Sequence, residues 1–139
     1  MDKVFQKFLR SGIELSVVGV ECREDNNPYF CTPKGASIFG WAGVDGIHFC
    51  FVRGFGSMGF SVSPMNSAPD FVHPLANNFA DFLRLLLACG DKAQFEAFLR
   101  DNPPTHEQKK ALSELAEKMK LTPMEQPWAY IKKLQASFD

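Results

Sequence analysis

The clearest hydrophobic pattern in the chain is a strict alternation within Gly46–Ser63, where two strand-like runs flank the glycine-rich stretch Gly54–Ser57. Alternation with a period of two predicts strands, and a short glycine-rich connection between them predicts a β-hairpin. Because successive strand side chains point to opposite faces, the first strand divides into two sets. One set is Ile47, Phe49 and Phe51, and the other is His48, Cys50 and Val52. In the second strand Met58, Phe60 and Val62 are expected to share a face.

A second strong pattern follows the hairpin, after a connection over Pro64–Pro74 that is rich in Pro, Asn and Asp. Apolar residues surround most of the segment Phe79–Cys89, which predicts a largely buried helix. Asn77 or Asn78 can cap its start, and Gly90 can end it. A sheet with one apolar face must cover it with another layer, so we expect this helix to pack across the hairpin sheet.

The N-terminal part carries shorter signals. Residues 1–10 place apolar side chains at helical spacing before Ser11-Gly12, which predicts a short helix. Glu14–Glu21 is rich in valine and reads as a strand, whereas Cys22–Ala36 is rich in turn residues, with a short extended piece expected at Tyr29–Cys31.

The last third is helical in pattern. Asp91–Arg100 is expected to form one helix, Thr105 with Gln108 forms a capping box that opens the next, and a final apolar stripe begins at Trp128. The sequence therefore predicts an α+β fold with a mainly antiparallel sheet, a central hairpin packed on a buried apolar helix, and a helical C-terminal third. We expect a single domain over residues 1–139, with the sheet and buried helix in 1–90 and a helical extension in 91–139.

Composition narrows the possible partners. The formal net charge is -1, so no large positive field is available to attract nucleic acid, and no apolar run approaches the ~20 residues of a membrane span. The first residues lack the apolar run of a secretory signal, and the four cysteines form no C-x-x-C pair. We therefore expect a cytoplasmic protein with reduced thiols.

Reactive constellations are weak in this sequence. His48 and Cys50 share one strand face, and His73, Cys31 or Cys89 could complete a zinc site. The simpler interpretation is that Cys50 is a small core residue and His48 a partly exposed edge residue. The run Gly54–Gly59 imitates a phosphate-binding loop, yet a strand follows it where such a loop requires a helix. We predict no catalytic residue, no metal and no cofactor.

Aromatic residues near turns suggest a different activity. Tyr29, Trp41 and Phe55 lie in or beside turns, as interface anchors commonly do, although they can equally fold back onto the core. With the loop acids Asp45 and Asp70 they are our candidate partner contacts. The leading hypothesis is a non-catalytic protein-binding module of undetermined oligomeric state. The alternative is a small enzyme or ligand-binding domain with a pocket near Cys31, His48 and His73.

The order of these elements resembles the SUKH superfamily. The resemblance rests on Gly43–Cys50, the strand after it, and the stretch Pro74–Leu83, in which Asn78–Leu83 looks like the family's polar-Phe-x-x-Phe-Leu helix signal. It covers approximately Glu14 to Leu87. The resemblance implies an α+β sheet flanked by helices and no catalytic residues. Many bacterial members are immunity proteins that neutralise a toxin domain, and others are regulatory interaction modules. Partner contacts differ between members, so the resemblance transfers no residue role.

Overall fold

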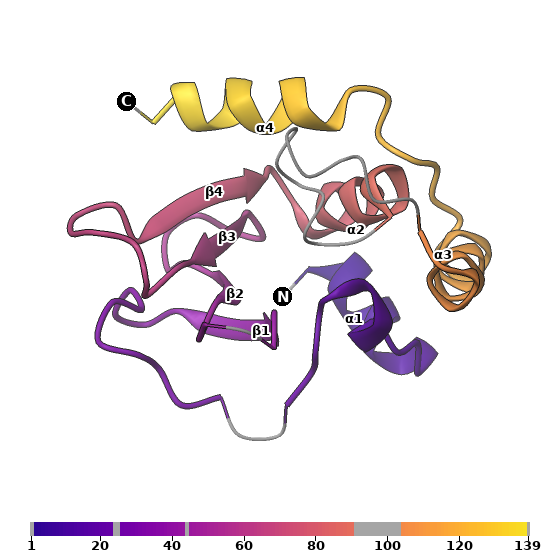
Figure 1. Cartoon of the computed structure of the whole chain (residues 1–139), viewed down its shortest axis with the longest axis horizontal. Helices are drawn as coiled ribbons and strands as arrows, with labels where there is room; N and C mark the ends of the chain where they lie inside the picture. Colours follow the sequence, from indigo (N-terminus) through magenta and orange to yellow (C-terminus); the bar gives the residue numbers. More distant parts are fainter. Residues whose placement is uncertain (1, 24–25, 44, 91–103, 139) are drawn as a thin grey trace.

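The computed structural model describes residues 2–23, 26–43, 45–90 and 104–138 of the chain. Within these ranges it contains a four-stranded antiparallel sheet in the order β1-β2-β3-β4, together with four α-helices and one short 3₁₀ helix (Figure 1). The strands are β1 (Ser37–Trp41), β2 (His48–Phe51), β3 (Gly59–Val62) and β4 (Val72–Ala76). The helices are α1 (Lys3–Ser11), η1 (Ser16–Val18), α2 (Phe79–Cys89), α3 (His106–Met119) and α4 (Pro127–Ala136). The predicted α+β class is confirmed.

The central hairpin is β2 and β3, as predicted. Cys50 pairs with Phe60 and His48 with Val62 across the antiparallel ladder. Phe49 faces the main hydrophobic core, whereas Cys50, Phe60 and Val62 form a second, smaller buried cluster on the other face. Each strand thus buries side chains on both faces, because the pleat sends neighbouring residues in opposite directions.

The apolar helix α2 covers one face of the sheet. It begins at Asn78, whose side chain accepts a hydrogen bond from the Asp81 amide, and ends at Gly90, which has a left-handed φ of 83°. Phe82 packs its ring 5.1 Å from that of Phe39 and 5.4 Å from that of Phe49, measured between centroids. The predicted packing of this helix on the hairpin sheet is confirmed.

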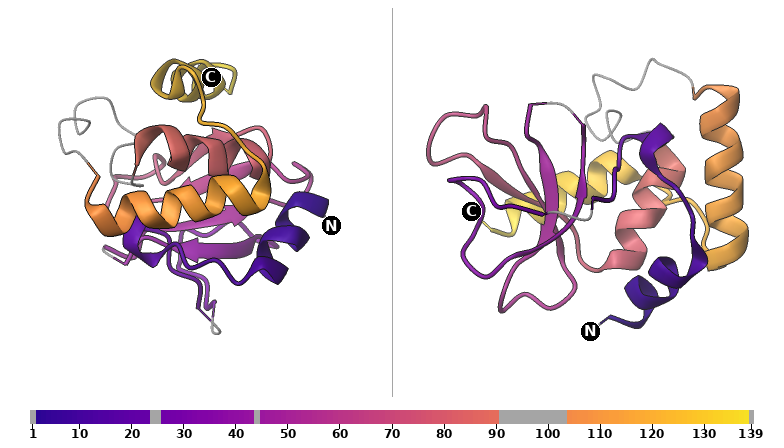
Figure 2. Two further views of the ribbon diagram at one scale, coloured as in Figure 1. Left: turned by 90° about the vertical axis from the view of Figure 1, so that its right-hand side faces the viewer. Right: turned by 90° about the horizontal axis from the view of Figure 1, so that it is seen from below.

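The remaining helices pack against α2 or against the edge strand β4. Figure 2 shows the sheet, then α2 with α1 beside it, and then α3 as an outer layer. The predicted capping box of α3 is present, since the Thr105 hydroxyl accepts from the Gln108 amide while the Gln108 side chain accepts from the Thr105 amide. Helix α4 runs along β4, where Gln135 donates a hydrogen bond to the carbonyl of Pro74. The helix predicted over Asp91–Arg100 lies outside the described residues.

Three predictions of local structure are wrong. The segment Glu14–Glu21 is not a strand, because it contains η1 and contributes only a bridge from Glu21 to Trp41. Conversely, β1 and β4 were not expected. Strand β4 contains Pro74, which lacks a backbone donor, and it is tolerated because β4 is an edge strand of the sheet. The extended piece expected at Tyr29–Cys31 is also a turn, closed by the Thr32 amide donating to the Tyr29 carbonyl.

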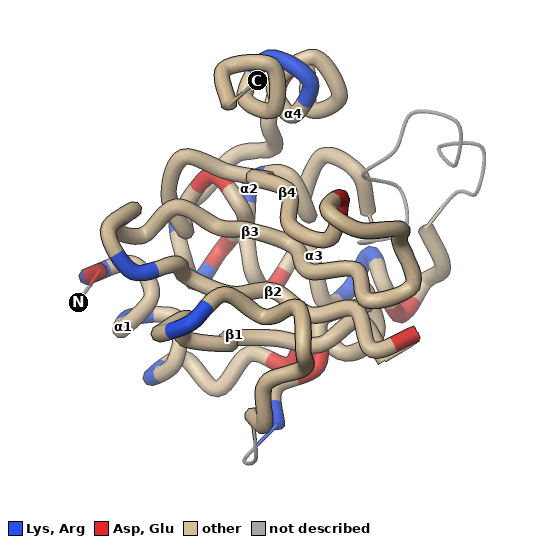
Figure 3. The backbone as a smooth tube through the Cα atoms, turned by 90° about the vertical axis from the view of Figure 1, so that its left-hand side faces the viewer, with Lys and Arg blue, Asp and Glu red and all other residues tan. Residues whose placement is uncertain are grey.

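Among the described residues, no helix lies over the strands on the face of the sheet turned away from α2. Figure 3 looks onto this face, with the four strands crossing the picture and α4 above β4. Residues 26–36, here named the strap, supply Cys31 and Ala36 to the small cluster on this face. None of the four strands contains a Lys, Arg, Asp or Glu, so the charged positions on this side lie in loops. None of the helices described here has the length and apolar character needed to cross a bilayer.

Candidate functional site

Most of the predicted partner contacts meet at one end of the sheet. The antiparallel register places the end of β1, the start of β2, the end of β3 and the start of β4 together. Loops 42–47 and 63–71 therefore project from the same end. Asp45 lies in the first of these loops and Asp70 in the second, and both are exposed. Two acids that are distant in the sequence thus belong to one region of the surface.

Two of the predicted aromatic residues pack against each other at this end. The ring centroid of Tyr29 lies 5.8 Å from that of Trp41 and 5.6 Å from that of His48. Tyr29 is 43% exposed, whereas Trp41 is only 3% exposed. The Trp41 indole donates to the Asn26 side chain at 2.8 Å, and the guanidinium of Arg23 lies 4.6 Å from the centre of its ring. Trp41 therefore supports Tyr29 from inside the fold rather than offering a contact surface of its own.

Phe30 and Met65 are the most exposed large apolar residues described, and sequence analysis did not select them. Phe30 is 79% exposed and Met65 is 75% exposed. The Phe30 ring meets that of Phe71 edge-on at 5.4 Å, which joins the strap to the base of loop 63–71. We name the loop-end surface for the residues at this end of the sheet: Tyr29, Phe30, Asp45, Met65, Asp70 and Phe71. The sequence signal for Phe30 was its place beside Tyr29 in a turn-rich segment.

A hydrogen-bond relay joins the turn that carries Phe30 to the buried ring of His48. The Tyr29 amide donates to the Thr32 hydroxyl oxygen at 2.9 Å, and that oxygen lies 2.8 Å from His48 Nε2. His48 Nδ1 lies 2.8 Å from the carbonyl oxygen of Gly46. Because a carbonyl can only accept, Nδ1 carries the proton, so Nε2 of the neutral ring accepts from the Thr32 hydroxyl. Burial lowers the pKa of His48, and the Gly46 carbonyl opposes that effect.

Loop 63–71 is ordered by its own hydrogen bonds. The Ser63 amide donates to the Phe71 carbonyl at 2.8 Å, which closes the loop at its base. The Asn66 side chain donates to the carbonyl of Asp70 at 2.9 Å. The carboxylate of Asp70 lies 2.6 Å from His73 Nε2. Loop 63–71 therefore presents its exposed side chains from a hydrogen-bonded backbone.

Phe55 lies apart from this surface. It belongs to the connection between β2 and β3, at the opposite end of the sheet. Its ring packs 5.4 Å from that of Phe60 and 5.9 Å from that of Phe138, and 46% of the residue is exposed. Of the five predicted contacts, Tyr29, Asp45 and Asp70 thus belong to the loop-end surface, whereas Trp41 is buried behind Tyr29 and Phe55 lies at the other end of the sheet.

The residues of the alternative pocket do not share one face of the sheet. The expectation that His48 is a partly exposed edge residue is wrong, because β2 is an inner strand. His48 is fully buried opposite Val62, on the face that Val72 also covers. His73 follows Val72 on the strand, so its side chain points to the other face. Cys31 lies on the strap, where burial raises the pKa of its thiol. The three residues therefore do not converge on a common reactive centre.

The cysteine thiols and the potential metal ligands are not arranged for catalysis or metal binding in the described part of the chain. All four cysteines are free, and burial raises the pKa of Cys50 to about 11 and that of Cys89 to about 12. A thiol with so high a pKa is protonated at neutral pH and is a poor nucleophile or metal ligand. Across the part of the chain that the structure describes, no three His, Cys, Asp or Glu residues gather to hold a metal ion.

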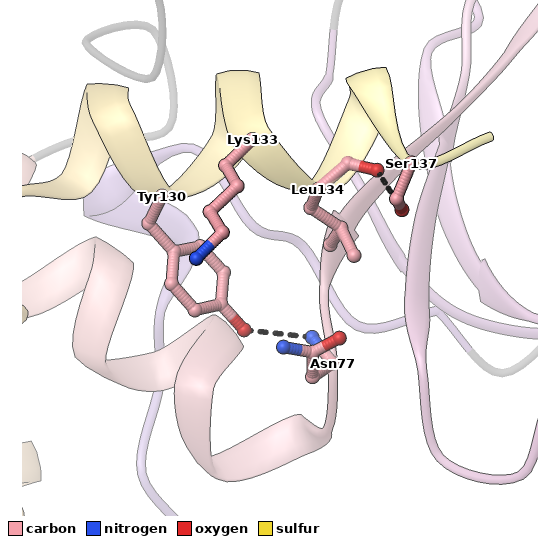
Figure 4. A pocket seen from close by; sticks show the side chains of 5 residues that line it. All are labelled: Asn77, Tyr130, Lys133, Leu134 and Ser137. Carbon is pink, nitrogen blue, oxygen red and sulfur yellow. Dashed lines mark hydrogen bonds between the residues drawn. The ribbon is translucent and has the colours of Figure 1, made fainter. Parts of the chain in front are cut away.

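A shallow pocket of about 250 Å³ lies between α4 and the junction of β4 with α2 (Figure 4). It is lined by Asn77, Tyr130, Lys133, Leu134 and Ser137. The Tyr130 hydroxyl accepts from the Asn77 amide and donates to the Asp81 carboxylate, both within 2.8 Å. Burial is the largest cause that raises the pKa of Tyr130 to about 12. This hydroxyl joins α4 to α2, and its bonding capacity is used within the fold.

Comparison with known proteins adds no family to this description. No protein-family model matches the chain, and searches of curated proteins and of solved structures also find no match.

Proposed function

We propose that this protein is a non-catalytic protein-binding module and that the loop-end surface is where its partner docks. The observation that carries the proposal is Phe30, a large apolar side chain that is 79% exposed on a turn whose hydrogen bonds lead to the buried ring of His48. Full burial of one phenylalanine side chain contributes about 1.5–3 kcal/mol. A partner that covers Phe30 would recover that free energy.

The hydrogen bonds that fix the conformation of the strap favour binding of a protein partner. Interfaces concentrate their binding energy in a few aromatic anchors, and an anchor that is already held in place loses little entropy when a partner arrives. Tyr29 and Phe71 flank Phe30 and are themselves partly exposed, while Asp45 and Asp70 supply polar groups around them. An apolar centre with a polar rim is the usual composition of a protein interface.

The chemistry of the candidate nucleophiles also favours binding over catalysis. His48 uses both ring nitrogens within the fold, and the cysteine thiols that the sequence offered as partners have raised pKa values. A general base needs a free nitrogen within reach of a substrate, and a cysteine nucleophile needs a thiolate. These groups stabilise the fold in the arrangement described.

Our narrower proposal is a cytosolic immunity or regulatory interaction protein of bacterial type that acts by steric occlusion. It rests on the resemblance to the SUKH superfamily, whose expected sheet and following helix are compatible with β1–β4 and α2. The net charge of -1 favours a protein partner over nucleic acid.

The proposal can be tested by quantitative affinity capture. Wild-type protein, Phe30→Ala and Leu9→Ala are immobilised and exposed to lysate of the source cells, and retained proteins are measured against the bait. Leu9 is the matched control, because it is also apolar and 55% exposed but lies on α1. We expect one protein to be retained in stoichiometric amount by wild type and Leu9→Ala, and to be at least ~10-fold depleted on Phe30→Ala. Equal retention by all three baits, or no retained protein, would contradict the proposal.

A further inference from the structure

His48 combines complete burial with a hydrogen-bond pattern that suits its neutral form, in which Nδ1 donates to a carbonyl and Nε2 accepts from a hydroxyl. The residue is 0% exposed, and its ring lies tilted against those of Tyr29 and Trp41 at centroid distances of 5.6 and 4.8 Å. Its Nδ1 proton is committed to the Gly46 carbonyl, and its Nε2 lone pair is committed to the Thr32 hydroxyl. The same hydroxyl oxygen accepts the Tyr29 amide proton. This imidazole thus links the turn of the strap to β2 by hydrogen bonds, beside the packing of Cys31 and Ala36 and the bond from Trp41 to Asn26.

A second proton on this ring would break that arrangement. Protonated Nε2 becomes a donor, so the Thr32 hydroxyl would have to rotate its own hydrogen away and accept from both the ring and the Tyr29 amide. The hydroxyl hydrogen would lose its acceptor inside the protein. A buried cation would also remain, and burying a charge without a partner is costly.

The surroundings of His48 offer little compensation for a positive charge. The titratable and charged groups around it are Tyr29, which packs against the ring, Cys50 on the same strand, Cys31 on the strap, and Arg23 with Glu21 next to Trp41. Glu21 is already paired with Arg23 at 3.2 Å. The Trp41 ring already faces the Arg23 guanidinium. In residues 2–23, 26–43, 45–90 and 104–138, no carboxylate forms an ion pair with His48.

We propose that His48 is an acid-sensitive latch for the strap, so that its protonation releases the turn that carries Tyr29 and Phe30. The latch is closed at neutral pH, where the ring is uncharged, and opens on acidification. Its consequence for a partner rests on the proposed function, because only then does release of the strap dismantle a docking surface. The latch itself is a property of the isolated chain.

The direction of the pH dependence follows from the burial of the ring. Burial lowers the pKa of His48 below its ordinary value of 6.5. The closed strap therefore binds a proton less readily than the open strap does. The stabilisation from the relay is complete above about pH 6.5 and is lost as the pH falls through the lowered pKa. Raising the pH should not open the latch, because the His48 ring stays neutral.

Nuclear magnetic resonance of the isolated protein tests the latch. The ring protons of His48 and the amides of residues 29–32 are followed from pH 8 to pH 4, with the amides of α3 as an internal control. We expect His48 to titrate below the midpoint of a blocked histidine in the same buffer. The strap amides should shift and exchange faster over the same pH range, while the α3 amides stay protected. A His48 midpoint at or above that of the blocked histidine, or strap amides that do not respond with it, would overturn the proposal.

Two substitutions at one position separate the latch from general destabilisation. Thr32→Val removes the hydroxyl that donates to Nε2 at nearly constant volume, so the neutral ring loses a bond and the His48 midpoint should rise. Thr32→Ser retains the hydroxyl and should keep the midpoint low. Equal midpoints in the two variants would contradict the relay. If Thr32→Val does not fold, the wild-type and Thr32→Ser titrations decide the matter. No partner is present in these measurements, so failure of the latch and failure of the proposed function are distinguishable.

Discussion

Two phenylalanines of this chain are predicted to lose very different amounts of stability when each is replaced by alanine. Phe82 is 1% exposed and packs against Phe39, Phe49 and Phe79 in the main core. Phe30 is 79% exposed and has a ring contact with Phe71. Phe82→Ala and Phe30→Ala remove the same atoms, so the difference between their effects measures the environments alone.

The expected magnitudes follow from the covered area. Phe82→Ala opens a cavity among packed rings and should lower the free energy of unfolding by about 3–5 kcal/mol. Only about a fifth of the surface of Phe30, or roughly 40 Å², is buried in the fold. At ~25 cal/mol per Å², Phe30→Ala should lower the free energy of unfolding by about 1 kcal/mol. Domains of this size are stable by about 5–15 kcal/mol, so Phe82→Ala removes a large part of the total.

Guanidinium denaturation followed by circular dichroism measures both values in one assay. We expect the midpoint of Phe82→Ala to fall well below that of wild type, and the midpoint of Phe30→Ala to stay close to it. Loss of less than about 1 kcal/mol in Phe82→Ala would refute the packing of α2 on the sheet. A Phe30→Ala variant as unstable as Phe82→Ala would refute the exposed, presented state of Phe30.

Three further substitutions test particular contacts by the same denaturation assay. Gly90→Ala should cost about 1–2 kcal/mol or more, because φ is +83° and an added Cβ would lie 2.8 Å from Pro104. Thr105→Ala removes one side of the capping box of α3 and should cost about 1 kcal/mol. Tyr130→Phe deletes the hydroxyl that donates to Asp81 at 2.7 Å and should cost about 1–3 kcal/mol, because it removes a hydrogen bond to a charged, partly buried carboxylate.

Matched controls make these three results interpretable. Gly54→Ala is also placed at a positive φ, of +92°, but an added Cβ there meets nothing within 4 Å, so it should cost less than Gly90→Ala. Ser113→Ala changes an exposed position within α3 and should leave stability within about 0.5 kcal/mol of wild type. For Tyr130, an absorbance titration should show one tyrosine ionising near a pKa of about 12 in wild type and not in Tyr130→Phe. A control as damaging as its partner, or an unchanged titration, would contradict the corresponding contact.

The helices that begin and end with local capping residues could be predicted from the sequence. Helix α2 begins at Asn78 and ends at Gly90, and α3 begins with the capping box of Thr105, because these residues satisfy or end the helix locally. Strands β1 and β4 depend instead on partners elsewhere in the chain. Pro74 argues against a strand until α4 and the edge position of β4 are known.

The candidate site was predictable only in part for the same reason. Tyr29 and Asp45 were selected from local turn signals, and the fold brings them to one end of the sheet. Phe30 was missed because nothing in a turn-rich segment reveals whether a ring faces the core or the solvent. Trp41 was selected as a contact, yet its long-range packing against Tyr29 and His48 buries it. Exposure is set by tertiary packing rather than by local sequence.

Site-specific photo-crosslinking in the source cells tests the central claim most directly. The crosslinking amino acid p-benzoylphenylalanine replaces Phe30 in one protein and Leu9 in another, so that both probes are exposed but only one lies on the loop-end surface. We expect one discrete crosslinked protein from position 30 and none from position 9. Absence of a crosslink from position 30, or the same products from both positions, would contradict a partner-binding role for this surface.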